Sequence, residues 1–174
     1  MATLNTDAPH GFDAHAPIYE LFEYTQDVND NTAIFIGDVV DMEDDGSISP
    51  ADGGSLNIVG VSNSYSAAST RAKVRVFAGV GQKYSVQGDS ETAGAADTGN
   101  NYYGSKNDHI VTHAGNANTK ISGMELDVAN QAGVGGVSVL GLFPQVGNAS
   151  GETHSEYFVV CNEHLNNKVD GSGI

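Results

Sequence analysis

The stretch RAKVRVFAGV, residues 71–80, alternates basic and apolar side chains. Lys73 and Arg75 fall on one side of this alternation, and Val74 and Val76 fall on the other. Side chains along a β-strand point to opposite faces in turn, so the pattern predicts a strand with one face in water and one face against a core.

Similar short stretches occur on both sides of this segment and predict further strands. They are rich in Val, Ile, Leu, Tyr and Phe, and clusters of Gly, Asn, Asp and Ser separate them. One of them, residues 121–133, also reads as a weak helix, but Gly123 argues against that alternative. With about eight strands and no convincing amphipathic helix, we expect an all-β fold, an antiparallel β-sandwich or barrel, with a jelly roll as one possible form. The other stretches are residues 33–40, 55–62, 82–89, 120–128, 135–143 and 156–164.

The two ends of the strand-rich region suggest how the chain is organised. Residues 1–33 are polar and interrupted by proline and glycine, which predicts an extended N-terminal arm, with a frayed terminus as the alternative. The arm has one apolar cluster, and we expect this cluster to bind a partner surface. Residues 34–174 are predicted to form a single β-rich domain with a long Gly/Asn-rich loop at 88–119. The cluster consists of Ile18, Tyr19, Leu21 and Phe22.

Charge is the strongest feature of the composition. The 174 residues include 22 acidic and 7 basic side chains, which gives a formal net charge of −15. Such a surface is repelled by nucleic-acid phosphates and anionic lipids, so we expect neither nucleic acid nor membrane as a partner. A single cysteine excludes an internal disulfide, and the N-terminus has no secretory signal pattern. We therefore expect a soluble protein made in the cytoplasm.

The segment DMEDDGSISPAD, residues 41–52, resembles a calcium-binding loop in the spacing of its acids. Asp41, Glu43, Asp45 and Asp52 fall at positions 1, 3, 5 and 12 of such a loop, and oxygen ligands at alternate positions can surround a large cation. The flanks read as strand rather than helix. The alternative is an acidic β-turn centred on Asp45-Gly46 between two strands, with no metal.

The stretch EYFVVCNEH, residues 156–164, brings Cys161, Glu163 and His164 close together in sequence. A nucleophilic cysteine needs a lowered pKa, partial exposure and a base directed at it. In a strand, Cys161 shares a face with Val159 and is more simply a small core residue. We therefore expect no enzyme activity.

The histidines give no clear metal motif. His109 and His113 are four residues apart, which would place them on one face of a helix, but their neighbours are typical of a loop. Zinc binding there is an alternative that we do not favour. We expect no cofactor.

Four stretches of the C-terminal half resemble, in the same order, a family of tailed-phage capsid decoration proteins, also called cement proteins. These stretches are VQGDSETAGAADTGNNY at 86–102, SGMELDV at 122–128, VLGLFPQVGNASGE at 139–152 and FVVCNEH at 158–164. The similarity covers residues 84–164, and extends more loosely over the strands between Ile34 and Val80.

This resemblance implies a structural virion protein that binds the outer surface of a capsid and bridges neighbouring major capsid protein subunits. It also implies assembly as a homodimer or homotrimer and a location on the capsid exterior. Under it, Asn162, Glu163 and His164 form a polar clasp at the end of a strand, with a structural role.

The alternative function is a calcium-dependent, carbohydrate- or surface-binding β-sandwich, such as a fibre or spike module. It draws on the acidic segment at 41–52 and on the tyrosines. The absence of Trp counts against a sugar-stacking surface. The tyrosines in question are Tyr65, Tyr84, Tyr102 and Tyr103.

Overall fold

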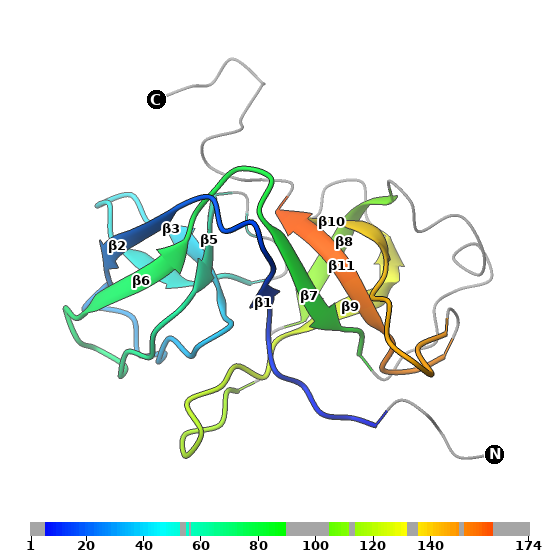
Figure 1. Ribbon diagram of the computed structural model, residues 1–174. Helices are drawn as coiled ribbons and strands as arrows, with labels where there is room; N and C mark the ends of the chain where they lie inside the picture. Colours follow the sequence, from blue (N-terminus) through cyan, green and yellow to red (C-terminus); the bar gives the residue numbers. More distant parts are fainter. Residues whose placement is uncertain are drawn as a thin grey trace.

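A computed structural model describes residues 6–52, 55, 57–89, 105–111, 114–131, 136–149 and 152–161. Within these residues the chain forms eleven β-strands in two antiparallel sheets, and no helix is present (Figure 1). The all-β, antiparallel prediction is confirmed, while a jelly-roll topology stays unconfirmed. The strands are β1 (Asp13–Ala14), β2 (Leu21–Thr25), β3 (Val39–Met42), β4 (Ile48–Pro50), β5 (Ile58–Ser62), β6 (Lys73–Phe77), β7 (Lys83–Gln87), β8 (Ser105–Val111), β9 (Glu125–Gln131), β10 (Val137–Leu142) and β11 (Glu156–Cys161).

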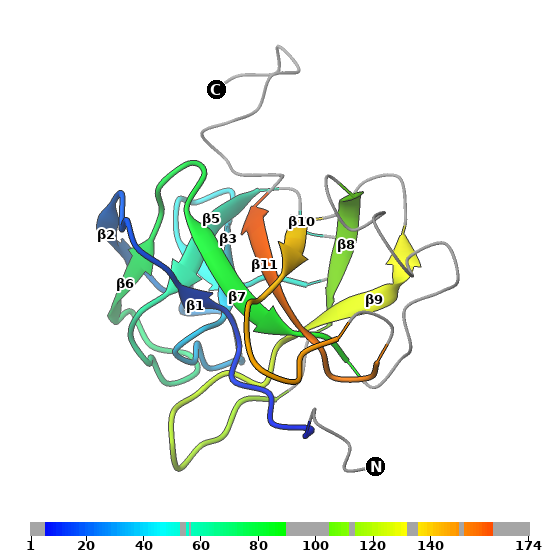
Figure 2. The ribbon, with the colours of Figure 1, turned by 45° about the vertical axis from the view of Figure 1, so that its right-hand side comes forward.

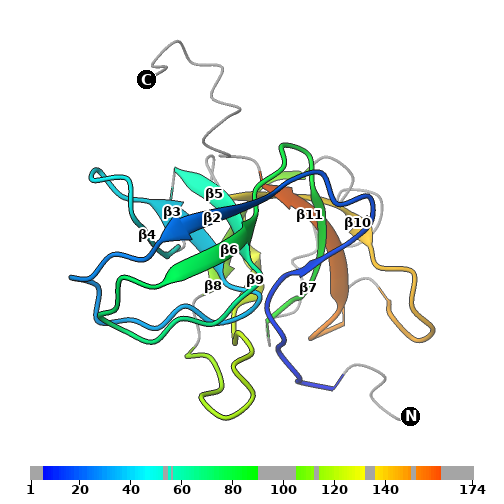
Figure 3. The same ribbon diagram turned by 60° about the vertical axis from the view of Figure 1, so that its left-hand side comes forward.

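Each sheet curls so that its ends approach each other. The six-stranded sheet has the order β1-β7-β11-β10-β8-β9, and Gly88, just after β7, bridges to Leu126 of β9. The five-stranded sheet has the order β2-β6-β5-β3-β4, and Gln26, just after β2, bridges to Ile48 of β4 (Figure 3). The two curled sheets pack side by side, with β7 of one facing β5 and β6 of the other (Figure 2).

Alternate residues of the five-stranded sheet enter two different apolar clusters. Val39 of β3 faces the larger cluster, which also receives Tyr84, Val86, Tyr157 and other side chains of the six-stranded sheet. Val40, the next residue, faces a smaller cluster enclosed by the five-stranded sheet itself. Strands β3 and β5 therefore have buried residues on both faces, whereas β6 keeps Lys73 and Arg75 exposed. The smaller cluster consists of Ile34, Val40, Ile48, Val59, Val74, Val76 and Ala78.

Strand β5 shows this arrangement most clearly, because all five of its residues are buried. Ile58 and Val61 join the larger cluster and Val59 joins the smaller one. Gly60 lies between them with φ +152°, and a Cβ atom there would lie 2.0 Å from the carbonyl oxygen of Phe77 on β6. Only glycine allows β5 and β6 to approach this closely.

A buried tyrosine connects the two sheets. Tyr84 of β7 is 1% exposed, and its hydroxyl donates a hydrogen bond to the carbonyl oxygen of Phe77 at 2.8 Å. Burial of the ring satisfies the apolar part of the side chain, and this bond satisfies its polar end.

The expectation of a separate arm over residues 1–33 is not confirmed for residues 6–33. β1 pairs with β7 in the six-stranded sheet, and β2 pairs with β6 in the five-stranded sheet over all five residues. Phe12 is 2% exposed in the larger cluster. The segment is extended, as expected, but it belongs to the domain because its backbone pairs with both sheets (Figure 1).

The predicted irregular loop at 88–119 contains strand β8. This strand pairs with β9 on one side and with β10 on the other. Its sequence, SKNDHIV, has little strand character of its own. Two neighbouring strands supply its hydrogen-bond partners, so the tertiary context rather than the local sequence makes this segment a strand.

Candidate functional site

The apolar cluster predicted to bind a partner lies on the surface. Ile18, Tyr19, Leu21 and Phe22 are 46%, 58%, 45% and 48% exposed, respectively. We call these four residues the apolar edge. Val80, in the turn between β6 and β7, is also 48% exposed.

The backbone of the apolar edge is held by a buried glutamine. Gln82 is 1% exposed, and its Oε1 accepts a hydrogen bond from the backbone N–H of Tyr19 at 3.2 Å. Its Nε2 donates to the carbonyl oxygens of His15 at 2.6 Å and Lys83 at 3.0 Å. One side chain thus fixes the approach to β2, and Tyr19 extends from a defined position.

Strand β2 is the outermost strand in the order of its sheet. One of its edges pairs with β6, from Leu21 opposite Phe77 to Thr25 opposite Lys73. Along its other edge, no strand of the described residues pairs with Leu21–Thr25, and β4 approaches only beyond the end of β2, where Gln26 bridges to Ile48. Glu20 and Glu23 are exposed beside the apolar side chains. The edge therefore offers strand backbone, large apolar groups and negative charge together.

The acidic segment at 41–52 forms a β-hairpin between β3 and β4. Asp41 pairs with Ser49 across the hairpin, and Gly46 has φ +81° in the turn. The backbone N–H of Ser47 donates to Asp45 at 2.9 Å, and that of Gly46 donates to the Glu43 carbonyl at 3.0 Å. This is the acidic turn that was the alternative to a calcium loop.

Three carboxylates of the segment, those of Glu43, Asp45 and Asp52, accept hydrogen bonds from nearby serine hydroxyls. The hydroxyl of Ser47 donates to Asp45, that of Ser49 to Glu43, and that of Ser55 to Asp52 at 3.3 Å. Hydrogen bonds from Ser47 hold the pKa of Asp45 below its usual value. Among the described residues, the group of three side chains whose ligand atoms lie within 4.8 Å of one another is Asp7, Glu125 and His154, far from this hairpin in the sequence.

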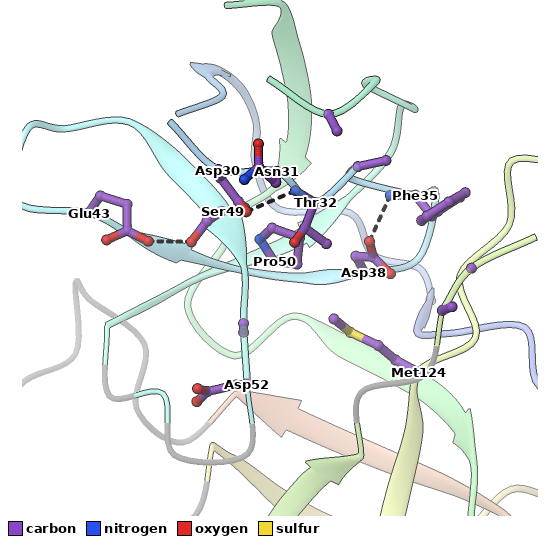
Figure 4. A pocket seen from close by; sticks show the side chains of 15 residues that line it. Asp30, Asn31, Thr32, Phe35, Asp38, Glu43, Ser49, Pro50, Asp52 and Met124 are labelled. Atoms are coloured by element: carbon purple, nitrogen blue, oxygen red, sulfur yellow. Dashed lines mark hydrogen bonds between the residues drawn. The ribbon is translucent and has the colours of Figure 1, made fainter. Parts of the chain in front are cut away.

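A cavity of about 670 Å³ lies beside the hairpin (Figure 4). Four acids line it, and no basic side chain is among its described lining residues. Phe35 and Met124 form part of its apolar wall. Its acids are Asp30, Asp38, Glu43 and Asp52.

Asp38 is the buried acid of this cavity, with 3% of its surface exposed. Its Oδ2 accepts a hydrogen bond from the backbone N–H of Phe35 at 2.7 Å (Figure 4). Burial raises the pKa of Asp38 to about 6, although hydrogen bonds from Ser122 and Phe35 oppose the shift. The sequence pattern gave no sign that this carboxyl would be buried.

Cys161 ends β11 with its side chain in the larger apolar cluster. It is a free, buried thiol, and burial raises its pKa to about 12. A thiol in this environment is a poor nucleophile because it is neither ionised nor accessible. The prediction that Cys161 and Val159 share a buried face is confirmed.

Several predicted residues cannot serve the roles considered for them, or lie outside the described residues. Asn162, Glu163 and His164, the predicted clasp, lie outside the described residues, as do Tyr102, Tyr103 and His113. Of the remaining tyrosines, Tyr84 is buried between the sheets. Tyr65 packs near Phe35, with the Lys120 Nζ 4.3 Å from its ring centre.

No protein family model matches this chain, and no curated protein matches it. In the described residues, no helix has the length and hydrophobicity needed to cross a bilayer. The function is therefore inferred from the surface geometry and from the resemblance of the C-terminal stretches.

Proposed function

We propose that this protein is a structural virion protein that binds the outside of a phage capsid and bridges neighbouring major capsid protein subunits. The observation that carries the proposal is the apolar edge, four large side chains that are 45–58% exposed on and beside the outermost strand β2. Several large exposed apolar side chains within five residues are more than the scattered single ones that are usual on a protein surface, and such groups are typical of protein-binding surfaces. The resemblance to capsid decoration proteins supports the capsid as the proposed partner.

The two aromatic residues of the apolar edge supply much of the available binding energy. A Tyr or Phe side chain buries roughly 200 Å² when it is fully enclosed. Tyr19 and Phe22 are 58% and 48% exposed, so a partner can cover about 200 Å² on the two together. At about 25 cal/mol per Å², this burial is worth about 5 kcal/mol before the costs of association.

Charge and backbone add specificity to the apolar contact. Glu20 and Glu23 flank the apolar edge, and the whole chain carries −15. A capsid surface with basic residues around an apolar centre would complement this arrangement. The acidic side chains would repel partners whose surface is also negatively charged. A strand of the capsid protein can also add to the open edge of β2.

Bridging requires contact with more than one capsid subunit. A homodimer or homotrimer supplies this, because symmetry presents one apolar edge per copy to successive subunits. Repeated contacts of modest affinity then act together on the capsid lattice. The proposal includes no catalytic step, consistent with the buried, protonated thiol of Cys161.

The structure gives less support to the calcium-dependent alternative than to the capsid proposal. The carboxylates of Asp45, Glu43 and Asp52 each accept a hydrogen bond from a nearby serine hydroxyl. Tyr84 is enclosed between the sheets and is not available to stack on a sugar.

The test measures binding to empty, expanded phage capsids assembled from purified major capsid protein. The double variant Tyr19→Ser/Phe22→Ser removes the aromatic part of the apolar edge at exposed positions, so the fold should remain intact. We expect the wild-type protein to sediment with capsids and to raise their resistance to heat. We expect the double variant to bind at least 100-fold more weakly, as loss of interface hot spots does.

Val146→Ser is the matched control, because Val146 is 100% exposed and lies between β10 and β11, away from β2 in the sequence. It should bind as the wild type does. Absence of wild-type binding would refute the capsid proposal. Equal binding by the double variant would show that another surface makes the contact.

A further inference from the structure

Three metal-ligating side chains from distant parts of the sequence meet at one end of the six-stranded sheet. The carboxylates of Asp7 and Glu125 and the imidazole of His154 have ligand atoms that all lie within 4.8 Å of one another. Asp7 belongs to the N-terminal segment, Glu125 begins β9, and His154 precedes β11. In Figure 2 these three parts of the chain lie at the lower end of the sheet, near the end of β7.

The end of β7 fixes the backbone around all three residues. The side chain of Gln87 accepts a hydrogen bond from the backbone N–H of Ala8 at 2.9 Å and donates to the Thr6 carbonyl at 2.9 Å, so it holds both neighbours of Asp7. The same Nε2 lies 3.4 Å from the carbonyl oxygen of His154. The glutamine is itself buried, with 9% of its surface exposed.

The backbone of Asp89 completes the frame. Its carbonyl accepts a hydrogen bond from the N–H of His154 at 3.2 Å, and its N–H donates to the carbonyl of Leu126, beside Glu125, at 3.0 Å. Hence the three side chains project from backbone that is tied to a single strand end. Such a frame keeps the candidate ligands together.

One ring nitrogen of His154 has no hydrogen-bond partner among the described residues. This atom, Nδ1, is also buried. A buried polar atom is normally satisfied, and a bound cation beside two carboxylates would satisfy this one.

We propose that Asp7, Glu125 and His154 form a binding site for a divalent transition-metal ion, with Zn²⁺ as the representative ion. One neutral imidazole and two carboxylates are suitable ligands for Zn²⁺, and their two negative charges balance the ion. Ligand atoms around a tetrahedral Zn²⁺ are roughly 3.3 Å apart. Side-chain rotations that shorten the distances between the ligand atoms by about 1 Å or a little more would reach this spacing. Water fills the fourth position, because the set provides three protein ligands.

The electrostatics of the group agree with this assignment. Burial and the nearby carboxylates of Asp7 and Asp89 raise the pKa of Glu125 to about 7, partly opposed by His154. A bound divalent cation would offset the repulsion between these carboxylates. When bound, it also connects the N-terminal segment to β9 and to the loop before β11, and so stabilises the fold independently of any capsid contact.

The test is a calorimetric titration of the purified protein with Zn²⁺, together with melting curves at each Zn²⁺ concentration. We expect one ion per chain and a melting temperature that rises until the site is saturated. Asp7→Asn removes an exposed carboxylate, and His154→Asn removes the imidazole while keeping a residue that tolerates φ +57°. Each variant should weaken Zn²⁺ binding at least 10-fold and reduce the rise in melting temperature.

Two controls remove comparable groups, one distant in the chain and one nearby. Asp44→Asn removes an exposed carboxylate of the β3–β4 hairpin. His10→Gln removes an imidazole that lies 3.8 Å from Glu156 and lines one cavity together with His154, so it tests whether this neighbouring histidine is a ligand. Both should bind Zn²⁺ as the wild type does. The assignment fails if the wild type binds no Zn²⁺, if Asp7→Asn and His154→Asn bind it normally, or if His10→Gln abolishes binding. It also fails if Ca²⁺ binds equally tightly and His154→Asn has no effect, because the imidazole is then not a ligand.

Discussion

The buried carboxyl of Asp38 makes the stability of this protein depend on pH. Asp38 is 3% exposed beside the acidic cavity, and its pKa is raised by burial from 3.8 to about 6. The substitution Asp38→Asn keeps an acceptor oxygen for the Phe35 N–H and removes the charge. Asparagine therefore tests the ionisation separately from the hydrogen bond.

The sign of the effect follows from the two protonation states. Because the pKa is raised in the folded protein, the contribution of Asp38 to the free energy of unfolding is fully present below pH 3.8. It is lost as the pH rises through about 6. A shift of about two pKa units corresponds to about 3 kcal/mol in all, of which about 2 kcal/mol is lost between pH 4 and pH 7.

Urea unfolding at several pH values between 4 and 8 measures this loss directly. The variant Asp38→Asn should gain about 2 kcal/mol relative to the wild type between pH 4 and pH 7, and the difference should level off above pH 7. Asp45→Asn is the control of opposite sign. Hydrogen bonds from Ser47 lower the pKa of Asp45, so its stabilising contribution is lost only at acid pH and its difference from the wild type stays constant from pH 5 to 8. A difference between Asp38→Asn and the wild type that does not change with pH would refute the reasoning.

Two substitutions test how the sheets are held together. Gly60→Ala should lower the free energy of unfolding by more than about 3 kcal/mol, because its Cβ would lie 2.0 Å from the Phe77 carbonyl oxygen. Gly81→Ala is the control. Gly81 has φ +79° and open space around it, so this substitution should lower the free energy of unfolding by only about 1–2 kcal/mol. Melting temperatures compare the pair, and a larger loss at Gly81 would contradict the proposed close approach of β5 and β6. Tyr84→Phe removes the 2.8 Å hydrogen bond between the sheets and should cost about 1–2 kcal/mol in urea unfolding, with an unchanged stability counting against a role for that bond.

The strands with strong side-chain alternation could be predicted from sequence. In β6, Val74 and Val76 are buried while Lys73 and Arg75 are exposed, as the alternation indicates. In β5, Val59 and Val61 both face inward, toward different clusters, which a single inward face would not allow for both of them and Ile58. Alternation identifies the two faces of a strand, but it does not say how many cores the sheet adjoins.

Segments whose structure depends on distant partners could not be predicted in the same way. β8 has a polar sequence and is a strand because β9 and β10 lie on either side of it. The residues 13–14 and 21–25 were expected in an arm, since nothing local indicates that they pair with β7 and β6.

The two candidate sites also differ in whether the local sequence could predict them. The apolar edge was recognisable because Ile18, Tyr19, Leu21 and Phe22 form a local cluster in a polar segment. The Asp7, Glu125 and His154 group has no local signature, because its three members come from widely separated parts of the sequence. Only the folded backbone brings such residues together.

Because β3 and β5 contribute to both apolar clusters, they also affect how the molecule unfolds. Val39 and Val40 are adjacent in the chain but anchor different clusters, so a fluctuation that detaches β3 disturbs both at once. Loss of one cluster therefore weakens the other, which favours a single all-or-none unfolding transition. Partly unfolded chains with unpaired strand edges, which aggregate readily, should therefore be scarce.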